Sequence, residues 1–417
     1  MPIHLDALAS PQRRALDVVR EVAREKNLRP YLVGGPVRDL LLGRTVIDLD
    51  FTLEEGSSTL ARSLAKRLNG RVRSYPQFLT YKVTAPEFPK IDIASARSEK
   101  YRAPGALPSV SEGRLQDDLM RRDFSINAIA LDVISDQLHD PTDGKRDLEN
   151  KTIRVLHDDS FIDDPTRIYR AIRLATRLGF ALDPRSRELM QKAIASGALR
   201  TVSKERLWRE LFLAFEEESA PAVMEALNNV LEVLFGPRQI DRSRLELAQQ
   251  IAKSDTSLDR EVLFTSAILR GNASPVDFEG SGFSQRRARN VMQIANEVAR
   301  YFDALSEATT ERQRFRLLKH ASPELQAVLA AIGRSEHVTR FQEYRNFRLP
   351  LRGSDLDVPV GPHIAKAIER TREAVFVGEI TPEEAQAFAQ RMAIKYLNPQ
   401  EGKDGKDGKD GQAGKRD

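Results

Sequence analysis

The hydrophobic and polar positions of the chain follow two patterns, and the change between them occurs near residue 150. The first 150 residues combine a helical pattern, which begins around Ser10 and Pro11, with short β-type runs. These runs lie at residues 31–33, 46–53, 79–84, 91–94 and 128–134. Because strands and helices are mixed, this part of the chain is expected to form an α/β or α+β unit.

Beyond residue 150, apolar residues recur at helical spacing. The predicted helices cover residues 164–180, 205–217, 221–234, 258–269, 284–305, 310–321, 322–332, 362–377 and 382–395. We therefore predict an α+β protein with a head (1–150), a helical neck (151–235) and a helical body and tail (236–400). Residues 401–417 contain Gly, Lys and Asp repeats without a large apolar side chain, and are expected to be disordered.

The composition narrows the class of protein. Hydrophobic residues make up 41% and charged residues 30% of the 417 residues, which is typical of soluble globular proteins. No apolar stretch approaches the roughly 18 residues that span a bilayer. Cysteine is absent, which excludes disulfides, thiolate zinc sites and cysteine nucleophiles, and we expect a cytoplasmic protein. With a net charge of only +4, a polyanionic partner would have to be bound by locally clustered arginines.

A glycine turn followed by two carboxylates is the most informative segment. The strand at 31–33 runs into Gly34 and Gly35, where a short helix opens and directs backbone N–H groups toward an anion. Arg38 can add a charged fork to the same phosphate. Asp48 and Asp50 lie two apart in a predicted strand, so both carboxylates face one side, about 7 Å apart.

The alternation around these carboxylates gives the strand two faces. Ile47, Leu49 and Phe51 are expected on the buried face. A carboxylate pair beside a phosphate cradle suits two Mg²⁺ ions, which activate an attacking hydroxyl and stabilise a leaving pyrophosphate. Asp92 is either a third metal carboxylate or an outward-facing strand residue. The glycine turn and the Asp-x-Asp pair are each common when they occur alone. Their occurrence together within about 20 residues favours a catalytic role for this segment.

Arginines occupy one side of the helix predicted over 164–180. They are Arg167, Arg170, Arg173 and Arg177, which fall within roughly 120° of one another at the helical pitch. Only Asp163 and Asp164 lie close in sequence as acidic partners. We therefore expect a triphosphate or an RNA backbone against this arginine stripe.

A second polar motif lies between the strands and this helix. The adjacent Arg121 and Arg122, with Asp123 and Asn127, can bind phosphate and ribose together, although the string alone also fits a charged helix start. The polar segment 97–105, which contains Gly and Pro, is expected to be an unpacked loop.

Together these motifs resemble the signature of class II tRNA nucleotidyltransferases, the CCA-adding enzymes and their bacterial poly(A) polymerase relatives. The resemblance rests on Gly-Gly-x-Val-Arg-Asp, Asp-x-Asp, Arg-Arg-Asp-x-x-x-Asn-Ala and Asp-x-x-Arg, and it covers about residues 31–211. Asp163 stands where the family usually has Glu. The resemblance implies a polymerase-β-like head with a mixed sheet, followed by an all-helical neck, body and tail.

The resemblance also implies roles for individual residues. Asp48 and Asp50 would be catalytic and would hold Mg²⁺. The nucleotide-binding residues would be Gly35, Arg38, Arg122, Asp164, Arg167, Arg170 and Arg173, with Asn127 a weaker candidate for the ribose. Asp164 and Arg167 would pair with the base edge of CTP or ATP and reject UTP and GTP. The segment 97–105 would be the family's flexible loop, which helps to switch specificity from C to A.

The implied activity is the addition of CCA, from CTP and ATP, to the 3′ end of tRNA with release of pyrophosphate. Three enzymatic alternatives share the same motifs: an enzyme that adds only CC, one that adds only A, and a poly(A) polymerase. An alternative from another class is a non-catalytic RNA-binding protein that retains the fold, against which the intact Asp48 and Asp50 argue.

Overall fold

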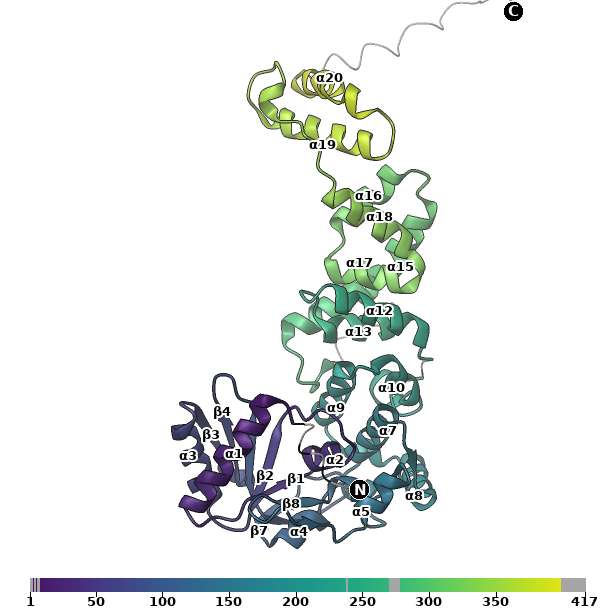
Figure 1. Ribbon diagram of the computed structural model, residues 1–417. Coiled ribbons are helices and arrows are strands. Elements are labelled where there is room, and N and C mark those ends of the chain that lie inside the picture. Colours follow the sequence, from purple (N-terminus) through teal and green to yellow (C-terminus); the bar gives the residue numbers. More distant parts are fainter. Residues whose placement is uncertain (1–2, 4, 6–7, 238, 270–277, 399–417) are drawn as a thin grey trace, which may run out of the picture. The chain divides into compact units, whose positions relative to one another are not determined.

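The computed structural model describes residues 3, 5, 8–237, 239–269 and 278–398 (Figure 1). The segment expected to be disordered, 401–417, lies outside them. The chain forms two compact units: Met1–Arg242 with Pro275–Ser284, and Ser243–Ser274 with Gln285–Asp417. The finer boundaries at 150, 235 and 400 stay predictions.

The first unit is built on a seven-stranded sheet with the order β3-β4-β5-β2-β1-β8-β9. The strands are β1 (Tyr31–Val33), β2 (Leu49–Leu53), β3 (Arg71–Tyr75), β4 (Thr80–Thr84), β5 (Ile91–Ser95), β8 (Ala130–Asp132) and β9 (Leu138–His139). β2 and β5 are parallel, whereas β1 pairs antiparallel with both β2 and β8. The predicted mixed sheet is therefore confirmed.

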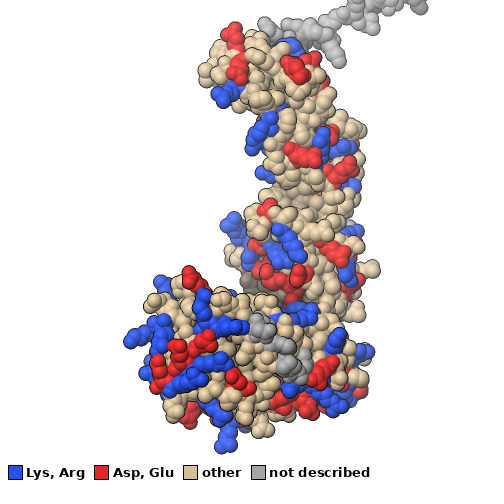
Figure 2. Space-filling model, viewed as in Figure 1, with Lys and Arg blue, Asp and Glu red and all other residues tan. Residues whose placement is uncertain are grey.

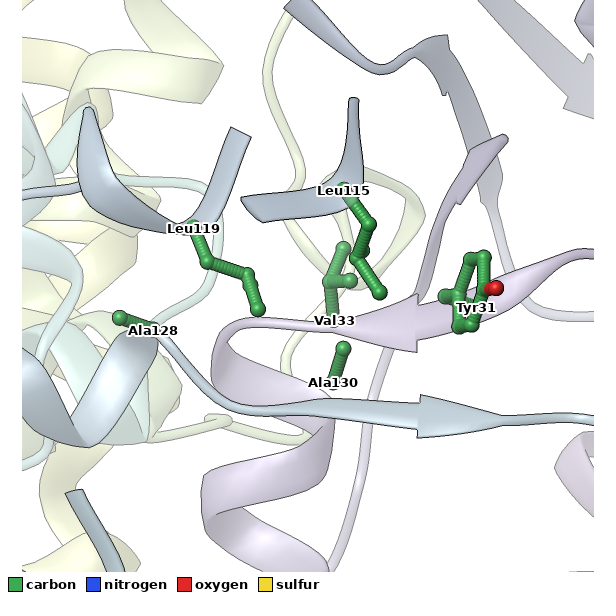
Figure 3. Packing of buried hydrophobic residues seen from close by; sticks show 6 residues of the cluster. All are labelled: Tyr31, Val33, Leu115, Leu119, Ala128 and Ala130. Atoms are coloured by element: carbon green, nitrogen blue, oxygen red, sulfur yellow. The ribbon is translucent and has the colours of Figure 1, made fainter. Parts of the chain in front are cut away.

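Helices cover the sheet and fix the ends of its central strands. α1 (Ser10–Glu25) packs against α3 (Ser57–Arg67), which contacts β3, β4 and β5. Figure 3 shows Leu115 and Leu119 of α4 (Leu115–Met120) directed at Val33 of β1, with Ala130 of β8 beneath it. This cluster anchors the end of α4 close to the glycine turn that follows β1.

One predicted strand is shorter than its sequence pattern. β2 begins at Leu49, because pairing with β5 starts only there, and residues 42–48 connect it to α2 (Gly35–Leu41). Leu49 and Phe51 are buried as expected, whereas Ile47 is 75% exposed. The placement of Ile47 on the buried face was wrong, because alternation buries a side chain only where the strand has neighbours.

The expected unpacked loop at 97–105 also differs. Residues Arg97–Lys100 form β6, which pairs with β7 (Ser109–Glu112) in a separate two-stranded sheet. Gly105 is buried, and its N–H lies 3.2 Å from the carbonyl oxygen of Ile162. The turn is packed because backbone hydrogen bonds, which side-chain polarity does not reveal, hold it to α6 (Ser160–Asp163).

After α5 (Gly144–Glu149), six further helices lie within residues 160–235 of the first unit. They are α6, α7 (Thr166–Leu178), α8 (Pro184–Ala195), α9 (Lys204–Glu216), α10 (Ala220–Ala226) and α11 (Glu232–Phe235). The single helix expected over 221–234 is two, because Asn228 interrupts it and its side chain instead accepts a hydrogen bond from the Ile240 N–H. α7 packs against α9 and α10.

The described residues of the second unit form helices and connecting segments, with no strand among them. Its helices are α12 (Arg242–Ser254), α13 (Arg260–Leu269), α15 (Gln285–Glu307), α16 (Glu311–His320), α17 (Pro323–Leu329), α18 (Ser335–Asn346), α19 (Pro362–Phe376) and α20 (Ala385–Leu397). Within the described ranges, no helix combines the length and apolarity that a bilayer crossing needs. Figure 2 shows basic and acidic side chains interspersed over the face in view, consistent with the nearly balanced charge.

Candidate active site

A cavity of about 450 Å³ in the first unit brings together most of the predicted site residues. Those that line it are Gly35, Asp50, Arg122, Asn127, Asp164, Arg167 and Arg170. Arg38 and Arg173 line a smaller neighbouring cavity of about 80 Å³. Asp48 is exposed and directly precedes β2. Motifs more than 100 residues apart in sequence therefore converge on one place.

The glycine turn makes room for an arginine. Gly34 has φ +74° and ψ −134°, a conformation that side chains disfavour. A Cβ atom at this position would lie 2.8 Å from Nη1 of Arg122. Arg122 also donates to the carboxylate of Asp118 at 2.9 Å. The guanidinium thus stands directly over the turn that the sequence marks as a phosphate cradle.

Replacing Gly34 by alanine should distort this arrangement. We expect Gly34→Ala to lower stability by about 1–3 kcal/mol, from backbone strain, and to raise the KM for nucleotide by displacing Arg122. Gly35→Ala is the control for folding, because its Cβ would meet only Arg38 at an ordinary 3.5 Å. Thermal melting and nucleotide titration measure the two effects. A Gly34→Ala protein that melts with wild type and keeps its KM would contradict this account.

Carboxylates gather on adjacent strands next to the turn. Asp50 of β2 is the register partner of Asp92 of β5, whose other neighbour is Lys82 of β4. Burial raises the pKa of Asp50 to about 6, and repulsion from Asp92 and Asp48 adds to the effect. Burial also raises the pKa of Asp92, although Lys82 lies 3.6 Å away. These carboxylates are held in a position that favours a compensating cation.

These carboxylates fit a magnesium ion that takes part of its coordination shell from the protein and the rest from a substrate. Among the residues that the structure describes, no three or more His, Cys, Asp or Glu form a metal site by themselves. Mg²⁺, however, typically uses one or two carboxylates and completes its shell with water and substrate phosphates. Oδ1 of Asp92 is buried without a hydrogen-bond partner, which leaves acceptor capacity beside Asp50.

Arg38 lies in the smaller cavity beside the site. It is 5% exposed and forms hydrogen bonds to the carboxylate of Asp39 at 2.8 and 2.9 Å. Its Nη1 donates to Oδ1 of Asn127 at 2.8 Å. The nucleotide contact expected of Arg38 stays a prediction.

Asp118 was missed by the sequence analysis. It is fully buried, and it accepts hydrogen bonds from Arg121 at 2.7 Å and from Arg122 at 2.9 Å. Burial opposes its ionisation, yet the two arginines hold the pKa of Asp118 below its usual value. Its spacing of three and four residues from the two arginines that directly follow α4 was the available signal.

Asp123, in the segment after α4, joins Asn127 to the arginine stripe of α7. Its carboxylate accepts hydrogen bonds from Arg170 at 2.6 Å and from Asn127 Nδ2 at 3.0 Å. Burial opposes its ionisation, but Arg170 and these hydrogen bonds hold the pKa of Asp123 well below its usual range. The reciprocal attraction of Asp123 raises the pKa of Arg170.

The rest of the stripe is neutralised from within the protein. Arg173 lies 3.2 Å from both Glu210 and Glu217, and Arg177 lies 3.8 Å from Glu217. These acids come from α9 and the residue after it, some 40 positions away in sequence. The stripe therefore does not require an external anion for Arg173 and Arg177, contrary to the expectation from its sequence neighbours. The nucleotide contact of Arg173 stays a prediction.

The two predicted base-reading residues are held by different partners. Asp164 accepts hydrogen bonds from the Thr166 hydroxyl at 2.6 Å and from Arg206 at 2.8 Å. Arg206 also donates to the carbonyl of Gly105 at 2.8 Å. Arg167 is 4% exposed and donates to the carbonyl of Arg121 at 2.9 Å. Sequence reasoning missed Arg206, because its partners lie 42 and 101 positions away.

Comparison with known proteins places this geometry in a family. Residues 30–154 match the Poly A polymerase head domain. An A-adding tRNA nucleotidyltransferase from Halalkalibacterium halodurans is 34% identical over 299 residues, which are 69% of this chain and 70% of that protein. The chain thus belongs to the family of tRNA nucleotidyltransferases and bacterial poly(A) polymerases, as its motifs predict.

Other relatives define how far the similarity extends. An A-adding tRNA nucleotidyltransferase from Geobacter sulfurreducens is 30% identical over 93% of this chain, which spans only 48% of that protein. Further relatives are named CC-adding tRNA nucleotidyltransferase and multifunctional CCA protein. A solved tRNA nucleotidyltransferase complexed with a primer tRNA and an incoming ATP analog is 29% identical, with a TM-score of 0.65 over 79% of this chain and 98% of that one.

Proposed function

We propose that this protein is a tRNA nucleotidyltransferase that adds CCA, from CTP and ATP, to the 3′ end of tRNA and releases pyrophosphate. The observation that carries the proposal is the single cavity shared by Asp50, Arg122 and the pair Asp164 and Arg167. Family membership and the solved relative with primer tRNA and an ATP analog support RNA and nucleoside triphosphate substrates.

Asp50 marks the catalytic side of the cavity. Asp48 and Asp50 would hold Mg²⁺, next to Asp92. The chemistry supplied by Mg²⁺ in such a site is activation of the attacking RNA 3′-hydroxyl and charge stabilisation on the leaving pyrophosphate. Arg122, above the glycine turn, binds and orients the triphosphate, because a guanidinium matches the geometry of phosphate oxygens.

Asp164 and Arg167 select the base. A carboxylate accepts from the amino group that cytosine and adenine share, whereas a guanidinium donates to ring nitrogens and carbonyl oxygens. Arg206 and Thr166 fix the Asp164 carboxylate through hydrogen bonds, so that the base meets a preformed edge. UTP and GTP carry a carbonyl where CTP and ATP carry the amino group, and their oxygen would face the carboxylate oxygen.

Removing the Asp164 carboxylate should relax this selection. We expect Asp164→Ala to reduce the preference for CTP and ATP over UTP and GTP by about 10- to 100-fold, the worth of one paired base edge. Steady-state incorporation of each of the four nucleotides measures it. Asp163→Ala is the matched control, because this neighbouring carboxylate does not line the cavity. Unchanged discrimination in Asp164→Ala would remove Asp164 from base selection.

Labelled CTP and ATP test the proposed activity on three substrates: tRNA lacking CCA, tRNA lacking only the final A, and complete tRNA. Addition of C, C and A to the first supports the proposal, and absence of incorporation into all three overturns it. Addition of a single A to the second alone would identify an A-adding enzyme. That second candidate is favoured by the names of the Geobacter and Halalkalibacterium relatives. Pyrophosphate release would exclude a non-catalytic RNA-binding protein.

A further inference from the structure

An exposed aromatic ring stands at the mouth of the active-site cavity. Phe78 is 43% exposed and is the only aromatic residue among the exposed large hydrophobic residues of the described chain. Leu107, which is 66% exposed, lines the same cavity. Exposed apolar side chains that share a ligand cavity are typical of a binding surface, because exposing them to water is otherwise unfavourable.

The backbone around Phe78 is held firmly. Phe78 ends a short 3₁₀ turn (Pro76–Phe78) between β3 and β4. Its carbonyl oxygen accepts hydrogen bonds from Arg97 at 2.6 Å and from the Thr80 hydroxyl at 3.0 Å. The next residue, Leu79, has φ +51°, which is unfavourable for a bulky side chain. Strain of this kind persists where the surrounding contacts impose it, and it is concentrated at functional sites.

The ring lies at the end of the strands that carry the carboxylates. Thr80, two residues after Phe78, pairs with Ala94 of β5. Ala94 is two positions, about 7 Å along the strand, from Asp92, which is the register partner of Asp50. Phe78 therefore lines the catalytic side of the cavity, whereas Asp164 and Arg167 line it from the neck helices.

The following inference rests on the proposed function. In that function, other residues already bind the incoming nucleotide, and Phe78 is not among them. The nucleotide's phosphates are assigned to Arg122 and its base edge to Asp164 and Arg167. The other substrate is the RNA, whose terminal nucleotide must bring its 3′-hydroxyl to Asp50. During CCA addition the terminal base of the primer is first the tRNA's own last base and afterwards C, so a single hydrogen-bonding edge cannot recognise it in every step. Stacking on an aromatic face tolerates every base.

We propose that Phe78 is the stacking platform for the 3′-terminal base of the RNA primer. Phe78 is then a residue that positions one substrate, and Leu107 adds apolar surface to the same cavity. Loss of the aromatic face should weaken binding of the primer without affecting binding of the nucleoside triphosphate.

The test uses the full chain and a tRNA lacking CCA that carries 2-aminopurine as its terminal base. Without nucleotide, wild type should quench the fluorescence of this base, Phe78→Tyr should retain the quenching and Phe78→Leu should lose it. In steady state, Phe78→Leu should raise the KM for tRNA roughly 5- to 100-fold and leave the KM for CTP within about twofold. Val72→Ala, an exposed apolar position outside the cavity, is the matched control.

Each outcome is decisive. Equal quenching by wild type and Phe78→Leu, or a rise in the KM for CTP in place of that for tRNA, would overturn the assignment while nucleotide addition by wild type still upholds the proposed function. If wild type adds no nucleotide, the proposed function fails, yet quenching that depends on the ring would still support stacking. Melting temperatures of the variants should match wild type, because the ring is exposed.

Discussion

Replacing Asp50 by asparagine is expected to reduce CTP and ATP incorporation by about 10³-fold or more. Asparagine retains the shape of the side chain but loses the charge that would hold Mg²⁺, whose charge stabilisation is worth several kcal/mol in the transition state. Single-turnover incorporation into tRNA lacking CCA measures the effect. Asp17→Asn, an exposed carboxylate on α1, is the control and should retain full activity. Incorporation by Asp50→Asn within tenfold of wild type would refute the assignment.

The same substitution should stabilise the protein above pH 6. Burial raises the pKa of Asp50 to about 6, so between about pH 4 and 6 the folded state binds more protons than the unfolded state. Stability therefore falls as the pH rises through this interval, and at pH 7.5 the ionised group costs about 3 kcal/mol. Asp50→Asn should remove this cost. Urea unfolding at pH 5 and 7.5 without divalent cations should show a smaller difference for the variant than for wild type.

Magnesium should act on the same group. At pH 7.5, a cation bound by the ionised carboxylates stabilises the folded state in proportion to its occupancy. Mg²⁺ should therefore raise the melting temperature of wild type and leave that of Asp50→Asn unchanged. An equal rise in both proteins would place the ion elsewhere. A protein that becomes more stable as it loses activity would also show that the loss is not caused by unfolding.

Much of the site follows from the sequence, because its motifs are local. Gly34, Asp50 and Arg122 each lie in a short segment whose pattern specifies both a turn or strand end and a polar group. The mixed sheet with a helical remainder likewise follows from the change of periodicity near residue 150. The edge strand β3 was not predicted, since four of its five residues are exposed and lack alternation.

What the sequence did not reveal is the partner of each charged group. Arg206 and Asp164 are 42 positions apart, and the acids that neutralise Arg173 lie on α9 and directly after it. Pairing at this distance depends on how helices pack, which helical periodicity alone does not specify. Phe78 was not selected for the same reason. From the sequence alone, an apolar residue such as Phe78 is expected in the core, and only the structure shows that its ring is exposed.

The second large effect is expected from Asp123→Ala. Asp123 is 8% exposed and binds Arg170 and Asn127, so its removal leaves a guanidinium and an amide without their acceptor. We expect a loss of about 3 kcal/mol in the free energy of unfolding of the first unit. Trp208, the chain's only tryptophan, is buried in this unit and reports its transition by fluorescence.

A double-mutant cycle separates the ion pair from the packing of either side chain. If Asp123 and Arg170 act on each other, Asp123→Ala combined with Arg170→Ala should cost at least 1 kcal/mol less than the sum of the single variants. Since the pKa of Asp123 lies well below its usual range, this coupling should be present at pH 7 and decline only as the pH falls below about 4. Additive losses would mean that Asp123 stabilises the head alone. Coupled losses would mean that this one carboxylate links the segment after α4, which also carries Arg122, to the helix that carries Arg167.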